Sequence, residues 1–360
     1  MDFAFKRQDE TGVAAETTKI VPLTCHGHSR PITHISFSPL LSPTGPAGPP
    51  STTSSSAPQY YMISACKDNN PMLRDGLTGD WIGTFIGHKG AVWSARLSDD
   101  AALAATGSAD FSAKVWDTFT GEALATLRHE HIVRAVAFPP GPRPGMLATG
   151  GMEKKLRVYD LSRASNGAAA NGAKPDSLPC CEVGAGEHSG AIKSIIWSRA
   201  DANILTTASD DKVLRWWDLR TPAPIATYTI LAPPTSCELT SASTSPATSP
   251  TTMSVAAGKN LYFFDAARPG TLTKHISTPR DVASVALNGT QTKFVTGSPG
   301  DTWVRVWDYE SEVEVEMGKG HHGPVWTTAF SPDGRMYATG SEDGTVKLWK
   351  FGAGGYGLWR

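Results

Sequence analysis

One spacing recurs along the chain and constrains its fold more than any other feature: an acidic residue stands six positions before a residue that is usually aromatic. Five pairs keep it in full: Asp110 and Trp116, Glu153 and Tyr159, Asp211 and Trp217, Asp301 and Trp307, and Asp343 and Trp349. In a sixth place, Arg74 stands where the aromatic residue should follow Asp68. In a seventh, Gly258 replaces the acid before Phe264. The seven marks are 42 to 58 residues apart, and a period of about 40–45 is typical of a small sheet repeated around an axis.

The unit from Gly87 to Asp117 shows what is repeated. It opens with Gly-His, closes with Trp-Asp, and contains three apolar runs of strand length, each bounded by a polar or glycine turn: Ala91–Leu97, Leu103–Thr106 and Ala113–Trp116. Such a unit predicts one four-stranded antiparallel sheet. Seven units predict an all-β chain that folds as a seven-bladed β-propeller over residues 18–350.

The ends of the repeat predict how the ring closes. Lys19–Thr24 has the pattern of a strand and lies just before Gly27-His28, whereas the last unit ends at Trp349 after three strands. We expect the N-terminal strand to complete the last blade, because this pairs the two chain ends and removes an open sheet edge.

Several segments do not fit the repeat. Residues 1–17 are polar and expected to be flexible, and three insertions rich in small or polar residues, at about 39–58, 162–177 and 243–252, are expected to be loose. The strand order places all three insertions at one rim. The opposite rim carries the Gly-His loops and the Asp turns, and we predict that it binds a partner. The alternative is that loose loops accumulate wherever nothing selects against them.

The repeated polar residues predict a structural network in each blade, in which a His before the first strand, an acid in the turn and an aromatic residue on the third strand are joined by hydrogen bonds. A hydroxyl such as Ser108 or Ser341 is expected to complete it. A catalytic role is less favoured, because the pair recurs in several blades without a nucleophile. The predicted members are His28, Asp68, His88, Asp110, Trp116, His129, Glu153, His188, Asp211, Trp217, Asp301, Trp307, His321, Asp343 and Trp349.

Candidate partner contacts follow from position on the first strand of each blade. The residue after the first apolar position should point to the open rim, which selects Thr33, Trp93, Arg134, Lys193, Ala283 and Trp326. Trp93 and Trp326, with Thr33 between them, are predicted to form one aromatic patch; the alternative is that either Trp packs between blades. In the tail at 351–360, Tyr356 and Trp359 either dock on the last blade or offer a short peptide to a partner.

Composition excludes several classes of function. Lys and Arg total 33 against 34 Asp and Glu, so strong direct nucleic-acid binding is not expected. The five cysteines show no zinc or redox spacing and are typical of a reducing compartment. The charged start MDFAFKRQDE is unlike a signal peptide, and no apolar run reaches the length of a membrane span. We therefore expect an intracellular monomer without cofactor or metal.

The Gly-His and Trp-Asp marks resemble the WD-repeat family. Within that family, the chain resembles the serine/threonine kinase receptor-associated proteins, also called unr-interacting proteins. The resemblance is carried by the first-blade stretch Met62–Leu97, by LTCHGHSRPI and HIVRAVAF, and by the ending YGLW. The resemblance implies a non-enzymatic scaffold, cytoplasmic and nuclear, in the survival-of-motor-neuron complex, which loads Sm proteins onto small nuclear RNAs for mRNA splicing. The implied partners are Gemin-like and survival-of-motor-neuron subunits, Sm proteins, receptor kinases and RNA-binding proteins such as unr.

Two alternatives stay open. One is a propeller subunit of the translation initiation factor three complex, whose family is closely related. An aromatic residue at position 74 and an ending other than YGLW would favour this alternative, whereas this chain has Arg74 and YGLW. An enzyme is the third choice, because no phosphate-binding loop, metal triad or Ser-His-Asp arrangement stands out in the sequence.

Overall fold

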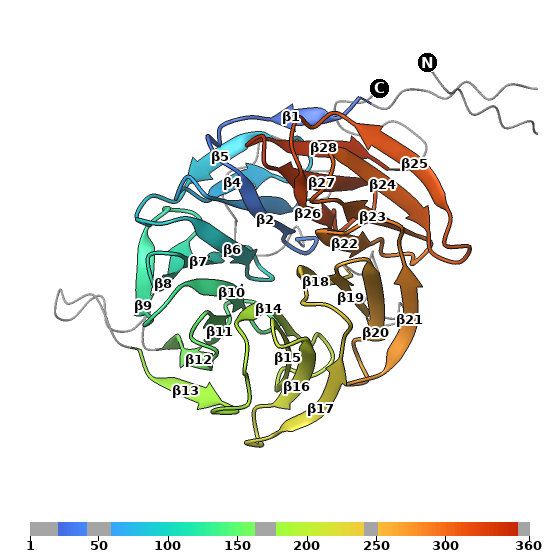
Figure 1. Ribbon diagram of the computed structural model, residues 1–360. Helices are drawn as coiled ribbons and strands as arrows, with labels where there is room; N and C mark the ends of the chain where they lie inside the picture. Colours follow the sequence, from blue (N-terminus) through green and yellow to red (C-terminus); the bar gives the residue numbers. More distant parts are fainter. Residues whose placement is uncertain (1–20, 42–58, 163–177, 241–250, 352–360) are drawn as a thin grey trace, which may run out of the picture.

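The computed structural model describes residues 21–41, 59–162, 178–240 and 251–351. These residues form seven four-stranded antiparallel sheets around a central channel (Figure 1), which confirms the predicted seven-bladed β-propeller. The predicted flexible start and the tail at 351–360 lie outside the described residues except for Phe351, and most of the three insertions also lies outside them. Within the described ranges there is no helix long and apolar enough to cross a membrane.

The strands follow one another from the channel outward within each blade. Blades one to three contain β2 (Ile32–Phe37), β3 (Tyr61–Cys66), β4 (Met72–Asp75) and β5 (Trp81–Thr84); β6 (Val92–Leu97), β7 (Leu103–Ser108), β8 (Ser112–Asp117) and β9 (Ala123–Arg128); and β10 (Val133–Ala137), β11 (Met146–Gly151), β12 (Leu156–Asp160) and β13 (Cys180–Val183). Blades four and five contain β14 (Ile192–Trp197), β15 (Ile204–Ser209), β16 (Val213–Asp218) and β17 (Pro224–Thr229); and β18 (Ser236–Leu239), β19 (Thr252–Ala257), β20 (Asn260–Asp265) and β21 (Leu272–Ser277). Blades six and seven contain β22 (Ser284–Leu287), β23 (Lys293–Gly297), β24 (Trp303–Asp308) and β25 (Glu314–Lys319); and β26 (Val325–Phe330), β27 (Met336–Ser341), β28 (Val346–Lys350) and β1 (Leu23–Cys25).

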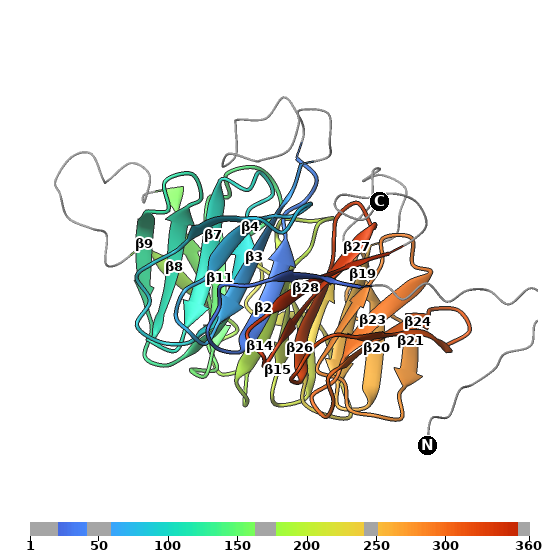
Figure 2. The same cartoon turned by 90° about the horizontal axis from the view of Figure 1, so that it is seen from above.

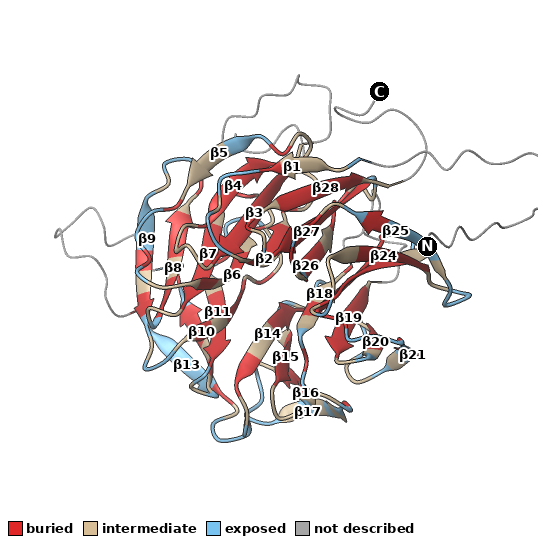
Figure 3. Cartoon of the chain, turned by 45° about the horizontal axis from the view of Figure 1, so that its top comes forward, coloured by how far each residue is buried: buried red, intermediate tan, exposed pale blue. Residues whose placement is uncertain are grey.

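Burial follows the position of each strand in its blade. Second strands such as β3, β19 and β27 are buried at every residue, whereas the outer strand β17 alternates between half-buried and exposed residues (Figure 3). This alternation is the two-residue period of a strand with one face on the core and the other in water. The inner and middle strands therefore carry the apolar runs seen in the sequence.

The hydrophobic core is divided among the seven blade interfaces. Each cluster of buried side chains joins two neighbouring blades: Val115 and Leu147 belong to the cluster between blades two and three, and Ile35 and Leu348 to the one between blades one and seven. Because every blade shares its apolar faces with two neighbours, the ring is stabilised as one unit.

The strand β1 closes the ring. It pairs antiparallel with β28, with Leu23 opposite Leu348 and Cys25 opposite Val346, and Lys347 Nζ donates to Thr24 Oγ1 at 2.7 Å. The N-terminal strand thus completes the last blade, as predicted. It runs over Leu23–Cys25; the first residues of the predicted range Lys19–Thr24 lie outside the described residues.

The up-and-down order of the strands gives the propeller two different rims (Figure 2). The strand ends that flank the three insertions, at 37 and 61, 160 and 180, and 239 and 252, all lie at one rim, which we call the insertion rim. The Gly-His loops and the acid turns lie at the other, the Gly-His rim. The functional site is built at the Gly-His rim, where the inner strands begin.

Candidate functional site

Five of the six contact residues predicted near the starts of the first strands share one backbone feature. The pairing of the first two strands shifts at Ile32/His34, Val92/Ser94, Val133/Ala135, Ile192/Ser194 and Val325/Thr327, so that one extra residue is left over in each blade. The extra residues are Thr33, Trp93, Arg134, Lys193 and Trp326. A β-bulge of this kind releases a residue from the ladder and redirects its side chain, and here it turns each one toward the channel opening.

The bulged residues meet at one cavity, which we call the mouth cavity. It has a volume of about 370 Å³ and lies where the channel opens at the Gly-His rim. Its lining includes the six predicted contact residues Thr33, Trp93, Arg134, Lys193, Ala283 and Trp326, together with His34, Lys67, Arg96, Glu238 and Pro299. A concave site with a few convergent polar groups has the shape of a binding site for a ligand or a peptide.

Trp93 is the centre of one wall of the mouth cavity. The guanidinium carbon of Arg134 lies 3.9 Å from the centroid of its ring, and Lys67 Nζ lies 5.7 Å from it. The indole nitrogen of Trp93 is buried and has no hydrogen-bond partner among the described residues. This wall therefore combines an aromatic surface with two cations.

The other predicted contacts are held by partners of their own. Trp326 is 37% exposed, and its indole N–H donates to Glu342 Oε2. Lys193 Nζ lies 3.1 Å from Asp210 Oδ1. The Thr33 hydroxyl donates to the Val92 carbonyl at 2.6 Å. Among the ring contacts of the described residues there is none between Trp93 and Trp326. The two indoles line the same mouth cavity with Thr33 of blade one between them, so the aromatic patch that includes all three residues stays a prediction.

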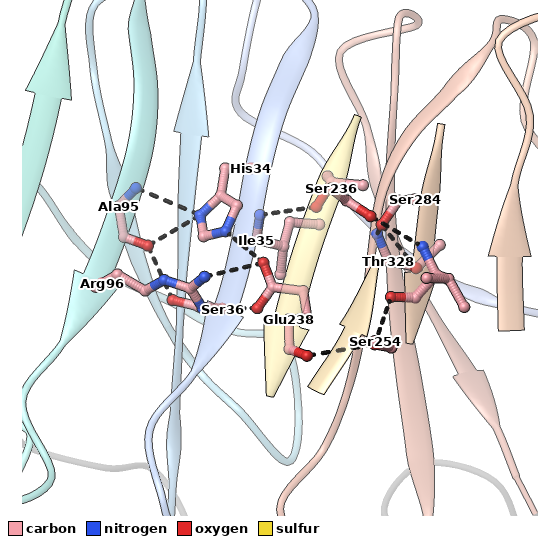
Figure 4. Close-up of polar contacts among 12 residues, drawn as sticks. His34, Ile35, Ser36, Ala95, Arg96, Ser236, Glu238, Ser254, Ser284 and Thr328 are labelled. Carbon is pink, nitrogen blue, oxygen red and sulfur yellow. Dashed lines mark hydrogen bonds and ion pairs between the residues drawn. The ribbon is translucent and has the colours of Figure 1, made fainter. Parts of the chain in front are cut away.

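A half-buried ion pair crosses the channel below the mouth cavity (Figure 4). Arg96 on β6 donates two hydrogen bonds to Glu238 on β18, at 2.8 and 2.9 Å, and His34 Nε2 on β2 lies 3.0 Å from Glu238 Oε1. These three residues, the cross-channel triad, join blades one and two to blade five. Arg96 and Glu238 also line a second cavity of about 150 Å³ that faces the insertion rim, so the triad separates the two cavities.

The electrostatics of the triad favour its ionised pair. Burial alone would raise the pKa of Glu238, but the Arg96 guanidinium and the hydrogen bond with His34 outweigh it and lower the pKa to about 2. Burial and the charge of Arg96 lower the pKa of His34. Glu238 is therefore a carboxylate at neutral pH, and its charge is neutralised by the bidentate contact with Arg96.

The predicted network is complete in blades two and seven. His88 Nδ1 lies 2.8 Å from Asp110, its Nε2 lies 2.7 Å from Thr106 Oγ1, and Trp116 donates to the same hydroxyl at 2.8 Å. Blade seven repeats this arrangement: His321 Nδ1 lies 3.0 Å from Asp343, its Nε2 lies 2.7 Å from Thr339 Oγ1, and Trp349 donates to the same hydroxyl at 2.8 Å. A side chain at Gly87, whose φ is +151°, would meet the ring of Trp116, which accounts for the glycine of the Gly-His pair.

The joining hydroxyl differs from the one predicted. Ser108 and Ser341 donate instead to the carbonyls of Gly90 and Gly323, because they lie two residues further along the second strand, at its end. Thr106 and Thr339 are completely buried and already accept a hydrogen bond from an indole. Although acid, imidazole and hydroxyl are in contact, no substrate can reach that hydroxyl, so the arrangement acts as a structural joint.

Four of the remaining blades keep the acid, whereas blade five has Gly258 in its place. In blade one, His28 contacts Asp68 and Ser64, while Arg74, in the aromatic position, donates to the carbonyls of His26 and Gly79. In three others an arginine two residues before the aromatic position pairs with the acid: Arg157 with Glu153, Arg215 with Asp211, and Arg305 with Asp301. Of the other predicted members of the network, His129 Nδ1 lies 3.4 Å from Glu153 Oε1, and His188 contacts Thr207 and Arg215. Trp217 donates to Thr207, and Trp307 donates to Thr296.

One group of metal-ligating residue types occurs in blade one, where His28, Cys66 and Asp68 lie together. Both nitrogens of His28 are engaged, by Asp68 at 3.0 Å and by Ser64 at 2.8 Å, and the Cys66 thiol donates to the Arg30 carbonyl. Burial raises the pKa of Cys66 to about 12, so the thiol is protonated near neutral pH and donates its hydrogen bond. The group fits a hydrogen-bonded turn better than a metal site.

The buried histidines predict that stability falls in mild acid. Burial lowers the pKa of His129 and of His188 from 6.5 to about 4, so between these values the unfolded chain binds protons that the folded chain does not. We expect Tm to fall as the pH is lowered from 6.5 to 4, and to fall further below 4 as Glu238 and Asp68, whose pKa values are held at about 2, become protonated. Thermal scans by circular dichroism between neutral pH and pH 3 measure this. A constant Tm down to pH 4 would contradict it.

Two of the structurally important residues were missed in the sequence. Arg96 and Glu238 form the cross-channel pair, and neither belongs to the repeated marks. The available signal was a charged residue inside the innermost strand of a blade, a position that is otherwise apolar or small. Tyr356 and Trp359, the predicted contacts in the tail, lie outside the described residues.

A model of the family described as "WD domain, G-beta repeat" matches residues 79–117, 182–218, 268–308 and 314–350. Each match ends with the third strand of a blade and begins at or next to the outer strand of the preceding blade. The repeat in sequence is thus offset by one strand from the blade in space. This offset is the same one that lets β1 complete the last blade.

Curated relatives match nearly the whole chain. The serine-threonine kinase receptor-associated protein of Gallus gallus is 40% identical over 94% of this chain and 85% of its own length. The protein of the same name from Dictyostelium discoideum is 38% identical over 91% of this chain and 98% of its own length. The eukaryotic translation initiation factor 3 subunit I of Culex quinquefasciatus is less similar, at 27% identity over 93% of this chain and 98% of its own.

Proposed function

The chain belongs to the serine-threonine kinase receptor-associated protein family of WD-repeat propellers, and from this premise we propose that it is a non-enzymatic scaffold in the survival-of-motor-neuron complex, where spliceosomal small nuclear ribonucleoproteins are assembled. The partners in this proposal are Gemin-like and survival-of-motor-neuron subunits and Sm proteins. Such a role places the chain in the cytoplasm and the nucleus.

The observation that carries the proposal is the similarity over almost the full chain, at 40% identity, to proteins of that family. The shape of the molecule supports a binding role, because five side chains released by β-bulges converge on one opening. The hydroxyls that contact His88 and His321 are buried inside their blades, which favours a scaffold over a hydrolase.

Purification of the tagged protein from its own cells, followed by mass spectrometry, tests the proposal. We expect Sm proteins together with Gemin-like or survival-of-motor-neuron subunits. Recovery of a stoichiometric set of translation initiation factor 3 subunits would overturn it and favour the alternative to which the weaker similarity points. Recovery of a receptor kinase without ribonucleoprotein subunits would also overturn it.

The indoles of Trp93, which is half-buried, and Trp326, which is exposed, are expected to contribute to binding at the Gly-His rim. Replacing both Trp93 and Trp326 by Ala should reduce the recovery of these subunits by about tenfold or more, because aromatic side chains at the centre of an interface contribute most of its affinity. The matched control is Trp81→Ala, since Trp81 is 61% exposed on the outer strand β5, away from the mouth cavity. Undiminished recovery with the double variant, at an unchanged Tm, would show that partners bind elsewhere.

A further inference from the structure

The lining of the mouth cavity carries more positive than negative charge, although the chain as a whole has a net charge of −1. The lining cations are Lys67, Arg96, Arg134 and Lys193, and the lining acid is Glu238. Glu238 is occupied by Arg96 and His34, and Lys193 is paired with Asp210. Among the described residues Lys67 and Arg134 form no direct ion pair with a carboxylate, although the charge of Asp210 acts on Arg134.

Arg134 is the more informative of these two cations. Its guanidinium stacks on Trp93 and makes no hydrogen bond or ion pair within the part of the chain that the structure describes. It is half-buried, and this burial lowers its pKa. A guanidinium has five donors and a strong preference for planar acceptors, so a partly desolvated one beside an open cavity lacks an acceptor.

The same wall holds a second donor without an acceptor. The indole nitrogen of Trp93, in the ring on which the guanidinium stacks, is buried and unpartnered among the described residues. Leaving a buried donor unpaired is unfavourable, because the group has lost its hydrogen bonds to water. Arg134 and Lys67 both lie near the ring of Trp93, so an anionic acceptor is favoured at this wall of the mouth cavity.

The facing part of the opening is apolar. It includes Ala283 and Pro299 of blade six and Trp326 of blade seven, and the other lining residues of these two blades, Ser284 and Thr327, are uncharged. A ligand that fills the mouth cavity therefore meets cations and an aromatic face on one side and apolar side chains on the other. A peptide with an acidic residue next to a large apolar residue offers both properties.

We infer that the mouth cavity binds an acidic segment of a partner protein, and that a carboxylate of this segment accepts hydrogen bonds from Arg134 beside Trp93. This inference rests on the proposed scaffold function and specifies the chemistry of the segment that the scaffold captures. Charge complementarity of this kind fixes which partner binds and in which register.

Selection from a library of random dodecapeptides displayed on phage tests the inference on the purified full-length protein. The library is first depleted on the Arg134→Gln variant and then selected on the wild type. We expect enriched peptides that share an Asp or Glu beside a large apolar residue. Enriched peptides without a shared acid, or no enrichment over the Arg134→Gln variant, would overturn the inference.

Fluorescence anisotropy with the best selected peptide separates charge from fold. Arg134→Gln, Lys67→Gln and the amide version of the peptide should each raise Kd, the first and the last by about tenfold or more, and Kd should rise with sodium chloride concentration. Lys89→Gln is the matched control, because Lys89 is an exposed cation of the same rim outside the cavity lining. Equal Kd values for the wild type, Lys67→Gln and Arg134→Gln would overturn the inference even if one variant were less stable.

The two proposals fail in different experiments. If acid-dependent peptides are selected but the tagged protein recovers no ribonucleoprotein subunits from cells, the proposed function fails and the peptide site stands. If those subunits are recovered but no acid-dependent peptide is selected, the inference about the mouth cavity fails and the proposed function stands.

Discussion

The variant Glu238→Ala should unfold at a clearly lower denaturant concentration than the wild type, with a loss of about 3 kcal/mol in the free energy of unfolding. The substitution removes the carboxylate that Arg96 and His34 share, and all three side chains are less than a quarter exposed. Arg96 would then keep its charge in the channel without a partner. The cost comes mainly from this stranded charge, because the pair itself contributes little beyond what its desolvation costs.

Three comparisons identify the cause of that loss. Glu238→Gln keeps the shape and an acceptor for His34, so its loss should be smaller. The double variant Arg96→Met with Glu238→Leu removes both charges and should recover most of the stability, since apolar residues of similar size often replace a buried pair without cost. Arg220→Ala, which breaks an exposed pair with Asp218, should leave the free energy of unfolding unchanged. The urea midpoint measures all four, and a Glu238→Ala midpoint equal to that of the wild type would contradict the assignment.

The architecture could be predicted from the sequence because each blade carries the same local marks. The acid in the turn and the aromatic residue on the third strand are fixed by hydrogen bonds within one blade, as with Asp110 and Trp116 around His88 and Thr106. Contacts of this kind repeat with the blade and therefore appear as a period. The closing strand could be predicted for a related reason, since a missing fourth strand at one end matches an extra strand at the other.

The cross-channel triad could not be predicted from that period. His34, Arg96 and Glu238 are far apart in sequence and come from blades one, two and five, and no local pattern says which inner strands face one another across the channel. The arginines of blades three, four and six were missed for a different reason. Arg157, Arg215 and Arg305 lie two residues before the aromatic position, where a charged residue on a strand is ordinarily read as exposed.

Blade one shows how a departure from the repeat is accommodated. Arg74 stands in the position of the aromatic residue and is 3% exposed, and its two terminal nitrogens are paired although its buried Nε has no partner among the described residues. It donates to the carbonyls of His26 and Gly79, which belong to the entry loop of the first blade and to the turn before its outer strand. The sequence marks this position as irregular but does not show that the arginine ties the chain start to the first blade.

Deleting residues 1–25 should be the most damaging truncation of the propeller, with a loss of at least about 3 kcal/mol in the free energy of unfolding. The deletion removes β1, so the backbone groups of β28 lose their partners and Leu348 loses the cover of Leu23. It also removes Cys25 from the cluster between blades one and seven. An unpaired strand at the edge of a sheet is a template for other chains, so we expect concentration-dependent oligomers by light scattering as well as a lower urea midpoint.

The matched control is a deletion of residues 1–19, which keeps β1 and should unfold at the wild-type urea concentration. A synthetic peptide of residues 18–27, added to the shorter chain, should raise its midpoint in proportion to the logarithm of the peptide concentration, because a segment that binds the folded state alone stabilises it by mass action. Equal midpoints for the two deletions would mean that the blade interfaces, and not the paired chain ends, hold the ring closed. In that case the pairing of β1 with β28 would contribute little to the free energy of unfolding.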